Sequence, residues 1–439
     1  MDRFFKITER GSSISTELMG GLTTFLAMAY IIAVNPPMME AAGIPLTAGL
    51  TATCFGAAAM CLLMGLIANR PIALASGMGI NAIVAYTLCG AQVGVDWRVA
   101  MGVVFLEGIV ILLLVVCGLR KAVMDAIPAS LRHAICIGIG LFIAFIGFQG
   151  GGMVVANEST LLSLGDFSSP QCLLSLISII IAGVLMAMNV KFALIISIVA
   201  SVIIGIPMGV TPMPTDWSFG LDFSAFAAPF QTDPNTSTMA IVEVFTTPML
   251  LMFAFTLLMS DFFDTMGGII AIGRVGGFAD DEGNVADTQK ILVVDSLAAA
   301  VGGFVGASSI TTFAESVAGV AQGARTGLSN IVVAALFIVF SFFSPLVSMV
   351  TSSATCGALT MVGVIIVTDV VHIDWTRVEI ALPAFLIIAC IPFTYSITDG
   401  IGLGFISYVI LMVARGKIRE VKPLMWVATA AFLVMFLLL

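Results

Sequence analysis

The chain has 439 residues, of which 60% are hydrophobic and only 10% are charged, and its mean hydropathy is +1.15. A soluble domain of this length needs more charge to cover its surface, so the composition excludes an ordinary soluble protein and places the chain in a lipid bilayer. The net charge is -9, and no basic patch interleaved with aromatic residues occurs, which excludes nucleic acid as a partner.

The cysteines and histidines form no recognisable metal or disulfide pattern. The eight cysteines are scattered through apolar runs and no CxxC occurs, which is typical of buried structural thiols. The two histidines, His133 and His372, lie far apart in the sequence, near the ends of predicted spans. We therefore expect no metal site, no disulfide framework and no cofactor.

Apolar runs long enough to cross a membrane follow one another along the whole chain. A transmembrane helix needs about 20 mostly apolar residues. Such runs occur at 17–35, 48–68, 98–118, 131–149, 172–190, 192–210, 241–270, 289–305, 326–343, 346–368, 379–394 and 397–414. Two shorter segments, 72–88 and 307–322, are interrupted by Gly, Ser and Thr and bring the total to about fourteen membrane segments. A final run, 424–439, is too short to decide between a span and an interfacial helix.

The positive charges fix the direction of these segments. With fourteen segments and a cytoplasmic N-terminus, every one of the 17 Lys and Arg residues except Arg98 falls in an inside loop. This bias is the one expected of a multi-pass membrane protein. The base-free stretches 150–171 and 211–240 then fall outside.

The two interrupted segments occupy matching places, since each is third within a set of seven. An odd number of spans per half inverts one half relative to the other, which predicts a 7+7 inverted repeat joined by the linker 211–240. Paired broken segments in an inverted repeat are a pointer to the binding site of a secondary transporter.

The first broken segment reads PIALASGMGINAIVAYT over residues 71–87. Its glycines, at 77 and 79, favour turned or extended backbone, which survives at membrane depth only beside protein or a water-filled cavity. Asn81 follows directly and offers both a donor and an acceptor. The alternative is a glycine-rich surface for helix packing with a capping Asn81.

The second broken segment, 306–327, reads GASSITTFAESVAGVAQGARTG. It places four hydroxyl side chains before Glu315, and a half-helix that starts here directs its N-terminal amides toward the membrane midplane. Glu315 is then suited to accept hydrogen bonds from a ligand or to carry a proton. The alternative is that Glu315 caps or braces this helix.

Further acidic residues lie inside the predicted spans. Asp261 and Asp264, in MSDFFDTMGG, are three residues apart and share one helix face, so we expect them to face the bundle interior or an aqueous path and to take up protons. A structural role for one of the pair is the alternative. Glu107 and Asp295 fit a proton path or packing equally well. The acids nearer span ends are expected to face water: Glu243, Glu379 and Asp399.

At several motifs the chain resembles the guanine–hypoxanthine, AzgA-like branch of the nucleobase–cation symporter-2 family. These motifs include FFKITERGSSISTELMGGLTTFLAMAYIIAVNP at 4–36, GMGINA, IGIGLFIAFIGFQGGGMVVAN at 137–157, SDFFDTMGG, ESVAGVAQGARTGL at 315–328 and PFTYSITDGIGLGFISY at 392–408. The resemblance runs almost from end to end.

The resemblance implies the all-α fold of the uracil permease relatives, in a bacterial-type inner membrane. Segments 1–4 and 8–11 then form a core domain, and segments 5–7 and 12–14 form a gate domain, often in a homodimer. In residues, the expected division is 1–16 (cytoplasmic N-terminus), 17–129 and 241–344 (core), 130–210 and 345–414 (gate), 211–240 (external linker) and 415–439 (basic tail and marginal segment). The implied activity is import of a purine nucleobase by proton symport, with H+ rather than Na+, through an elevator-type movement.

The resemblance also implies the site, between the third, eighth and tenth segments. The residues expected to bind the purine are Asn81, Asp261, Glu315, Gly79, Ile80, Thr312 and Ala314. Those expected to couple protons are Asp264, Asp261 and Glu315. No catalytic residue is expected.

The chain departs from the family pattern where the motifs are expected to line the pocket. Members usually have APGMGLNAFFAYT, VTTYIES and FDTIGTL where this chain has ASGMGINAIVAYT, ITTFAES and FDTMGGI. These changes leave the choice of base open.

Three other functions remain as alternatives. The first is a carrier of another small planar or anionic solute on the same fold, although paired acids repel an anion. The second is a membrane enzyme such as a two-aspartate protease, but Asp261 and Asp264 share one helix and no GxGD occurs. The third is a passive channel, which concentrative uptake would exclude.

Overall fold

The structure is a computed structural model. It describes residues 2–90, 93–118, 127–157, 159–190, 192–214, 220–278, 285 and 287–438. Within these ranges, the side chains of residues 263, 264, 266, 267, 270, 271, 274, 344, 398, 435 and 438 are not described.

The first part of the chain builds three spans and one broken segment. Its elements are α1 (Asp2–Phe5), α2 (Ile14–Met28), α3 (Tyr30–Ala41), α4 (Leu46–Leu63), η1 (Met64–Ala68), β1 (Leu74–Ser76), α5 (Met78–Ala82), η2 (Ile83–Leu88) and α6 (Trp97–Val116). The polar residues Ser13 and Asp96 cap α2 and α6 by accepting hydrogen bonds from backbone amides. Helices α2 and α3 together form one span of 28 residues.

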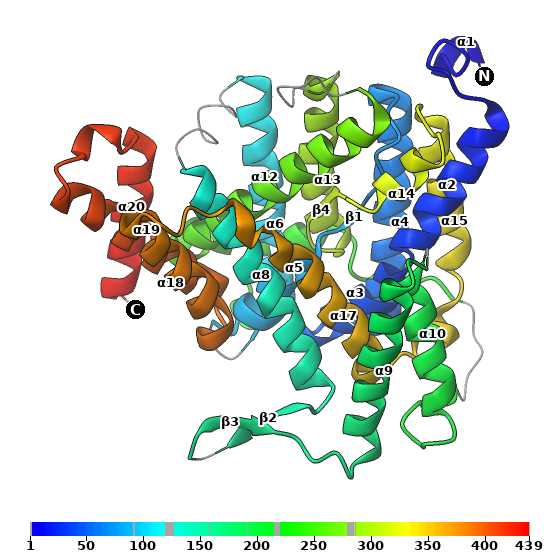
Figure 1. The fold of residues 1–439 in the computed structure, drawn as a ribbon, viewed down its shortest axis with the longest axis horizontal. Helices are drawn as coiled ribbons and strands as arrows, with labels where there is room; N and C mark the ends of the chain where they lie inside the picture. Colours follow the sequence, from blue (N-terminus) through cyan, green and yellow to red (C-terminus); the bar gives the residue numbers. More distant parts are fainter. Residues whose placement is uncertain are drawn as a thin grey trace.

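The next part consists of three helices and a small hairpin. Its elements are α8 (Ala129–Gly150), β2 (Val154–Asn157), β3 (Leu161–Leu164), α9 (Pro170–Ala187), α10 (Ala193–Gly205) and η3 (Ala228–Phe230). The hairpin lies at the end of the molecule opposite α1 and the N-terminus (Figure 1). That placement agrees with the predicted external position of 150–171.

The second half repeats the pattern of the first. It contains α11 (Ala240–Thr246), α12 (Pro248–Gly276), α13 (Thr288–Val305), β4 (Ile310–Thr312), α14 (Ser316–Ala321), α15 (Leu328–Phe340), α16 (Ser344–Val347), α17 (Ser352–Val367), η4 (Thr368–His372), α18 (Val378–Thr394), α19 (Ile397–Ala414), η5 (Ile418–Glu420) and α20 (Pro423–Leu438). Helices α11 and α12 meet at a bend of 99°.

The fold confirms the predicted all-α membrane architecture. Seven of the described helices are long and apolar enough to cross a membrane, or eight if the bent pair α11–α12 is one span. The other predicted segments appear as shorter apolar helices or as the strand–helix elements β1–α5–η2 and β4–α14. The marginal segment at the C-terminus forms α20, which packs against α19.

The two broken segments meet in the middle of the bundle. Strand β1 pairs antiparallel with β4 in the register Leu74↔Thr312, Ala75↔Thr311 and Ser76↔Ile310. Figure 1 shows this pair at mid-height, enclosed by helices on all sides. The third segments of the two halves therefore satisfy each other's backbone hydrogen bonds, as non-helical backbone at membrane depth requires.

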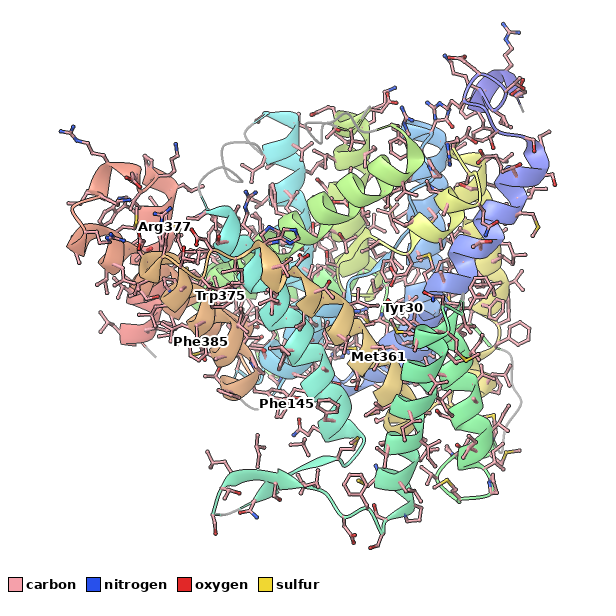
Figure 2. All side chains as sticks on the ribbon, in the orientation of Figure 1. Tyr30, Phe145, Met361, Trp375, Arg377 and Phe385 are labelled. Carbon is pink, nitrogen blue, oxygen red and sulfur yellow. The ribbon has the colours of Figure 1, made fainter. Side chains whose placement is uncertain are left out.

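The helices pack in two groups. Around the strand pair, α6 packs on α13, and α15 packs on α2 and α4. In the other group, α17 packs on α8, α9 and α10, while α18 packs on α8 and α19. Side chains fill the spaces between the helices (Figure 2).

Helices α6 and α13 approach so closely that Gly108 has no room for a side chain. A Cβ at Gly108 would lie 2.1 Å from the backbone nitrogen of Ala300 and 2.6 Å from its Cα. We expect Gly108→Ala to force these helices apart and to lower the free energy of unfolding by about 1–3 kcal/mol.

The matched control is Gly183→Ala on α9, where the nearest atom to a new Cβ is Cε of Met361 at 4.0 Å. Because alanine favours a helix over glycine, this variant is expected to be neutral or up to about 1 kcal/mol more stable. Unfolding of both variants in detergent measures the difference. Equal stabilities would show that α6 and α13 adjust freely.

Loops that the charge pattern assigns to the cytoplasm meet at one ion cluster. Asp287 accepts hydrogen bonds from Nη2 and Nε of Arg70 at 2.8 and 3.2 Å, and Lys290 and Arg10 lie 3.7 and 3.9 Å from its carboxylate. Partial burial acts to raise the pKa of Asp287, but the hydrogen bond and charge of Arg70 and the two further cations outweigh it and hold the pKa below its usual value. The cluster joins the N-terminal loop to the loops that precede β1 and α13.

The expectation that Glu379 faces water is wrong. Its side chain is 1% exposed and lies between two cations, with its carboxylate 3.1 Å from Nη2 of Arg377 and 2.5 Å from Nη1 of Arg415. The partner Arg415 follows α19, so the contact depends on how α18 and α19 fold against each other. A span-end acid in this chain is therefore a helix-pairing residue.

Candidate functional site

The strand pair is held at both ends by further backbone contacts. The amide of Gly77 donates to the carbonyl of Ser309 at 2.9 Å, and the amide of Phe313 donates to the carbonyl of Ala73 at 3.0 Å. Ser316 Oγ accepts from the amide of Ala73 at 2.9 Å. These bonds fix where each broken segment turns from strand into helix, and so fix the position of Glu315.

Asp295 holds β4 from behind. Its carboxylate accepts hydrogen bonds from the backbone amide and Oγ1 of Thr312 at 3.0 and 2.9 Å, and from Oγ1 of Thr265 at 2.7 Å. Thr265 also lies 2.8 Å from Oγ1 of Thr311. Asp295, on α13, is fully buried. It therefore anchors the strand that carries the predicted site residue Thr312, a structural role that the sequence left open.

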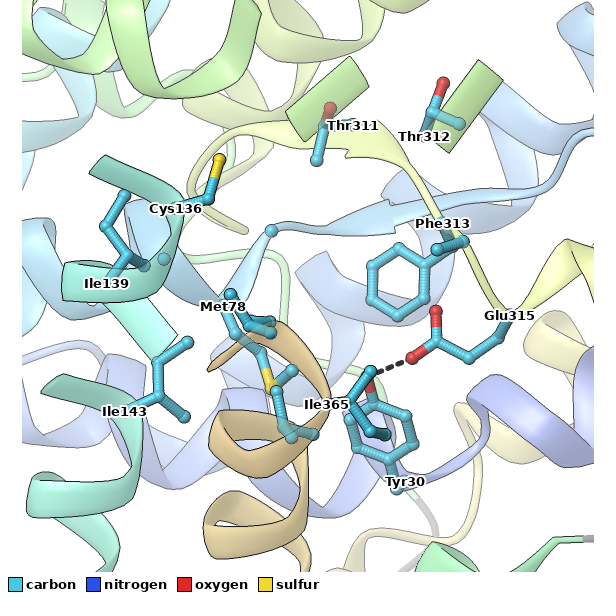
Figure 3. A pocket seen from close by; sticks show the side chains of 15 residues that line it. Tyr30, Met78, Cys136, Ile139, Ile143, Thr311, Thr312, Phe313, Glu315 and Ile365 are labelled. Atoms are coloured by element: carbon cyan, nitrogen blue, oxygen red, sulfur yellow. Dashed lines mark hydrogen bonds between the residues drawn. The ribbon is translucent and has the colours of Figure 1, made fainter. Parts of the chain in front are cut away.

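A cavity of about 190 Å³ lies beside the strand pair. The broken segments form one wall, together with Tyr30, and helices α8 and α17 form the other. The lining residues are Tyr30, Gly77, Met78, Gly79, Cys136, Ile139, Ile143, Thr311, Thr312, Phe313, Ala314, Glu315, Val362, Ile365 and Ile366. The cavity thus lies between the two helix groups (Figure 3).

Glu315 is the acidic residue of the described cavity wall, and Tyr30 is its partner. The hydroxyl of Tyr30 donates to Oε1 of Glu315 at 2.6 Å, as drawn in Figure 3. Glu315 stands at the N-cap of α14 but makes no side-chain cap hydrogen bond there. Glu315 therefore does not cap this helix, but its hydrogen bond to Tyr30 braces the start of α14 against α3, which is the other form of that alternative.

The rest of the cavity wall is largely apolar. Phe313 and Tyr30 place their ring centroids 6.4 Å apart on the wall that also holds Met78, and Ile139 and Ile143 of α8 lie across the cavity (Figure 3). Among the described residues that line it there is no Lys, Arg or His. A single carboxylate within apolar and aromatic walls suits a small, flat, uncharged ligand that presents hydrogen-bond donors.

The predicted site residues fall into two sets. Gly79, Thr312, Ala314 and Glu315 line the cavity. Asn81, Ile80 and Asp261 are fully buried and are not among its lining residues. Asp264 lies on α12, and its side chain falls outside the described part of the structure.

Asn81 makes a contact between helices. Its Nδ2 donates to Oδ1 of Asn35 at 2.6 Å, and Asn35 donates to Oγ1 of Thr53 at 2.8 Å and to the carbonyl of Ala307 at 3.3 Å. This buried chain joins α5 to α3, α4 and the segment before β4. Asn81 thus positions the first broken segment in this structure.

A group of buried acids lies behind the strands. Glu107 on α6 interacts electrostatically with Asp261 and Asp295, and all three are fully buried. Neither oxygen of Glu107 makes a hydrogen bond of ordinary distance and angle among the described residues, although the hydroxyl of Ser309 lies near enough to act on its carboxylate. The three acids come from three different helices, so no local pattern indicates that they lie close together.

Several cavity residues were not expected from the sequence. Tyr30 could have been found from the sequence, because a tyrosine in the middle of a span is unusual in this chain, which has four tyrosines. The cavity residues of α8 and α17 could not have been found in this way, since cavity-facing and lipid-facing residues of these helices are equally apolar. Of the departures from the family pattern, Phe313 and Ala314 line the cavity, whereas Ser76, Ile83 and Val84 are buried away from it.

Comparison with solved structures supports this description of the fold. The chain superposes on the transmembrane domain of a cyanobacterial bicarbonate transporter, BicA, with a TM-score of 0.63 at 18% identity, over 90% of this chain and 97% of that one. It superposes on the murine anion transporter Slc26a9 with a TM-score of 0.62 at 12% identity, over 92% and 69% of the two chains.

Comparison of sequences identifies the family. A family model described as "Permease family" matches residues 15–403. The guanine/hypoxanthine permease PbuG of Bacillus subtilis is 38% identical over 100% of both chains, and the adenine permease AdeP of Escherichia coli is 36% identical over 99% of this chain and 95% of its own. The chain therefore belongs to the permease family, the nucleobase–cation symporter-2 family, and is a membrane transporter rather than an enzyme.

Proposed function

We propose that this protein imports purine nucleobases by proton symport and that the base binds in the cavity beside Glu315. The observation that carries the proposal is the position of this carboxylate, on a cavity wall with no described cation. Relatives named as guanine/hypoxanthine and adenine permeases support a purine as the substrate.

The chemistry of a purine fits this wall. The base presents adjacent N–H donors on one edge, which a carboxylate accepts in a paired, charge-assisted arrangement. Its flat faces are suited to the ring of Phe313 and to the aliphatic side chains of α8 and α17. A cavity of about 190 Å³ is below the roughly 300–1,000 Å³ of drug-sized pockets, in keeping with a small ligand.

Proton coupling is proposed to involve Glu315, Asp261 and Asp264. An ionised Glu315 accepts from the base, whereas a protonated one competes with it as a donor, so protonation and substrate affinity are linked. The electrostatic contact between Asp261 and Glu107 adds a second place where a proton would be held, because two charged acids in one dry site repel. Na+ coupling is the alternative.

The movement is proposed to be of the elevator type, with a core domain (17–129 and 241–344) sliding against a gate domain (130–210 and 345–414). The separate packing of the two helix groups supports this division. The cavity has one wall on each group, so a relative shift of the groups would carry the bound base across. The apolar surfaces of the gate helices suit lipid or a second copy in a homodimer, in an inner membrane with the N-terminus cytoplasmic.

The main competing function is transport of an anion, because two solved structures with a similar fold are a bicarbonate transporter and an anion transporter. A carboxylate without a nearby described cation repels an anion, and this favours the neutral base.

Uptake of radiolabelled guanine, hypoxanthine or adenine into proteoliposomes tests the proposal. A pH gradient, acid outside, is expected to drive accumulation, and a protonophore is expected to abolish it. Accumulation driven by a Na+ gradient at equal pH would show that the coupling ion is Na+ and not H+. Uptake of bicarbonate and of none of the purines would overturn the substrate assignment.

A further inference from the structure

The two histidines of the chain meet at one end of the bundle. His133 is the fifth residue of α8 and His372 ends η4, so they are far apart in the sequence. Their rings stack with centroids 5.0 Å apart and planes at 25°. Stacking of the only two imidazoles of a chain is not explained by hydrophobic burial, because their side chains are 34% and 59% exposed.

A carboxylate joins this pair. Asp369, one turn before His372 on η4, places one oxygen 3.3 Å from Nδ1 of His133 and the other 3.7 Å from Nδ1 of His372. One ligand atom from each of the three residues lies within 4.8 Å of the other two. Two imidazoles and a carboxylate converge here from two separate elements.

We propose that His133, Asp369 and His372 form a binding site for a divalent transition-metal ion, with Zn²⁺ as the best match. Zinc takes imidazole nitrogens and a carboxylate oxygen at about 2.0–2.2 Å, and three protein ligands leave a fourth position for water. Mg²⁺ and Ca²⁺ select oxygen ligands, so two imidazoles exclude them.

The geometry needs little adjustment to hold the ion. Tetrahedral ligands at these bond lengths lie about 3.4 Å apart. Oδ2 of Asp369 already lies 3.3 Å from Nδ1 of His133, and a rotation of His372 would bring the third ligand atom in from within 4.8 Å. The side chains of Asp369 and His372 are 43% and 59% exposed, so both are free to rotate toward an ion. The loop after η4 is already held against α8, because the amide of Asp374 donates to Oγ of Ser130 at 3.5 Å.

The site would join the ends of the two helices that line the cavity. His133 lies one turn before the cavity residue Cys136 on α8, and Asp369 lies one turn after the cavity residue Ile366. Figure 2 shows Trp375 and Arg377 on the loop that follows. The charge pattern predicts that this end of the bundle is cytoplasmic. A bound ion would therefore fix the spacing of α8 and α17 just below the cavity, on the predicted cytoplasmic side.

Zinc titration of the purified full-length protein tests the site, with an affinity tag that contains no histidine. Calorimetry is expected to show one Zn²⁺ per chain, and His133→Asn, His372→Asn and Asp369→Asn are each expected to weaken binding by at least about 100-fold, more than loss of an outer partner costs. Because the chain has two histidines, ¹⁵N-histidine labelling reports only on this site, and both imidazole signals are expected to shift on zinc binding.

Two matched controls are expected to bind zinc as the wild type does. Asp374→Asn removes a carboxylate of the same loop that bonds Thr376 instead, and Cys117→Ser removes an exposed thiol that competes for zinc. Unfolding without metal shows whether each variant is folded. Three outcomes would each overturn the proposal. They are unchanged zinc affinity in the histidine variants, zinc binding that leaves the imidazole signals unshifted, and no binding at about 0.1 mM zinc. That concentration is about ten to a hundred times the Kd of a micromolar site.

Discussion

The substitution Glu315→Gln is expected to weaken purine binding by about 100-fold or more. Glutamine keeps the size of the side chain and an oxygen that accepts from Tyr30, but it removes the negative charge that faces the cavity. Charge-assisted hydrogen bonds contribute about 1.5–3 kcal/mol each, and about 2.8 kcal/mol corresponds to a factor of 100. Equilibrium binding of labelled guanine or hypoxanthine to purified protein measures the change.

The same substitution at Glu243 is the matched control. Glu243 lies on α11, where it accepts from Oγ1 of Thr236 at 2.8 Å, and it does not line the cavity. Glu243→Gln is expected to bind purine as the wild type does. If Glu315→Gln binds within about threefold of the wild type, less than about 0.7 kcal/mol, Glu315 does not contact the base and the proposed binding mode fails, while the family assignment stands.

Replacing Asp295 by alanine is expected to lower the free energy of unfolding by about 3 kcal/mol or more and to abolish uptake. The change removes the acceptor of three hydrogen bonds and leaves the buried amide and hydroxyl of Thr312 without it. Each buried polar group left unsatisfied costs about 1–3 kcal/mol. Because Thr312 lies on the cavity wall, release of β4 also displaces the site.

Two comparisons isolate this effect, both measured by unfolding in detergent and by purine uptake. Asp295→Asn retains one acceptor oxygen and is expected to lose less stability than Asp295→Ala. Ser296→Ala removes a buried hydroxyl whose recorded hydrogen bond, among the described residues, is to the carbonyl of Leu292 within its own helix. It is expected to cost about 1 kcal/mol or less. Full stability and uptake in Asp295→Ala would show that β4 is held by the strand pairing alone.

The amino-acid sequence alone predicts the membrane character, the order of the membrane segments and the presence of two broken segments at matching places in the two halves. These features are local, because an apolar run of about 20 residues reports its surroundings directly, and a glycine-rich break within such a run reports a non-helical backbone. The same reasoning pointed to Glu315, because a carboxylate beside a helix break at membrane depth must face either a cavity or polar partners within the protein. The family motifs added Gly79, Thr312 and Ala314, which line the cavity.

Which side chains face each other depends on how distant segments pack, and this became known from the structure. Asn81 matched the pattern of a ligand-binding residue, but its partner is Asn35 on α3. The sequence fitted Asp295 to a proton path or to packing equally well. In the structure its carboxylate accepts two hydrogen bonds from Thr312 of β4 and one from Thr265, so it anchors β4. The residues by which α8 and α17 line the cavity are apolar, as are the residues of these helices that face lipid or another helix. No sequence pattern therefore distinguishes them.

The two histidines show most clearly that sequence patterns do not report contacts between distant segments. In the sequence they are isolated residues near the ends of two spans, and no spacing rule joins them. In the structure they stack on each other beside Asp369. Local pattern reports how each segment meets its solvent, whereas contacts between distant segments depend on how α8 and α17 pack, which no local pattern contains.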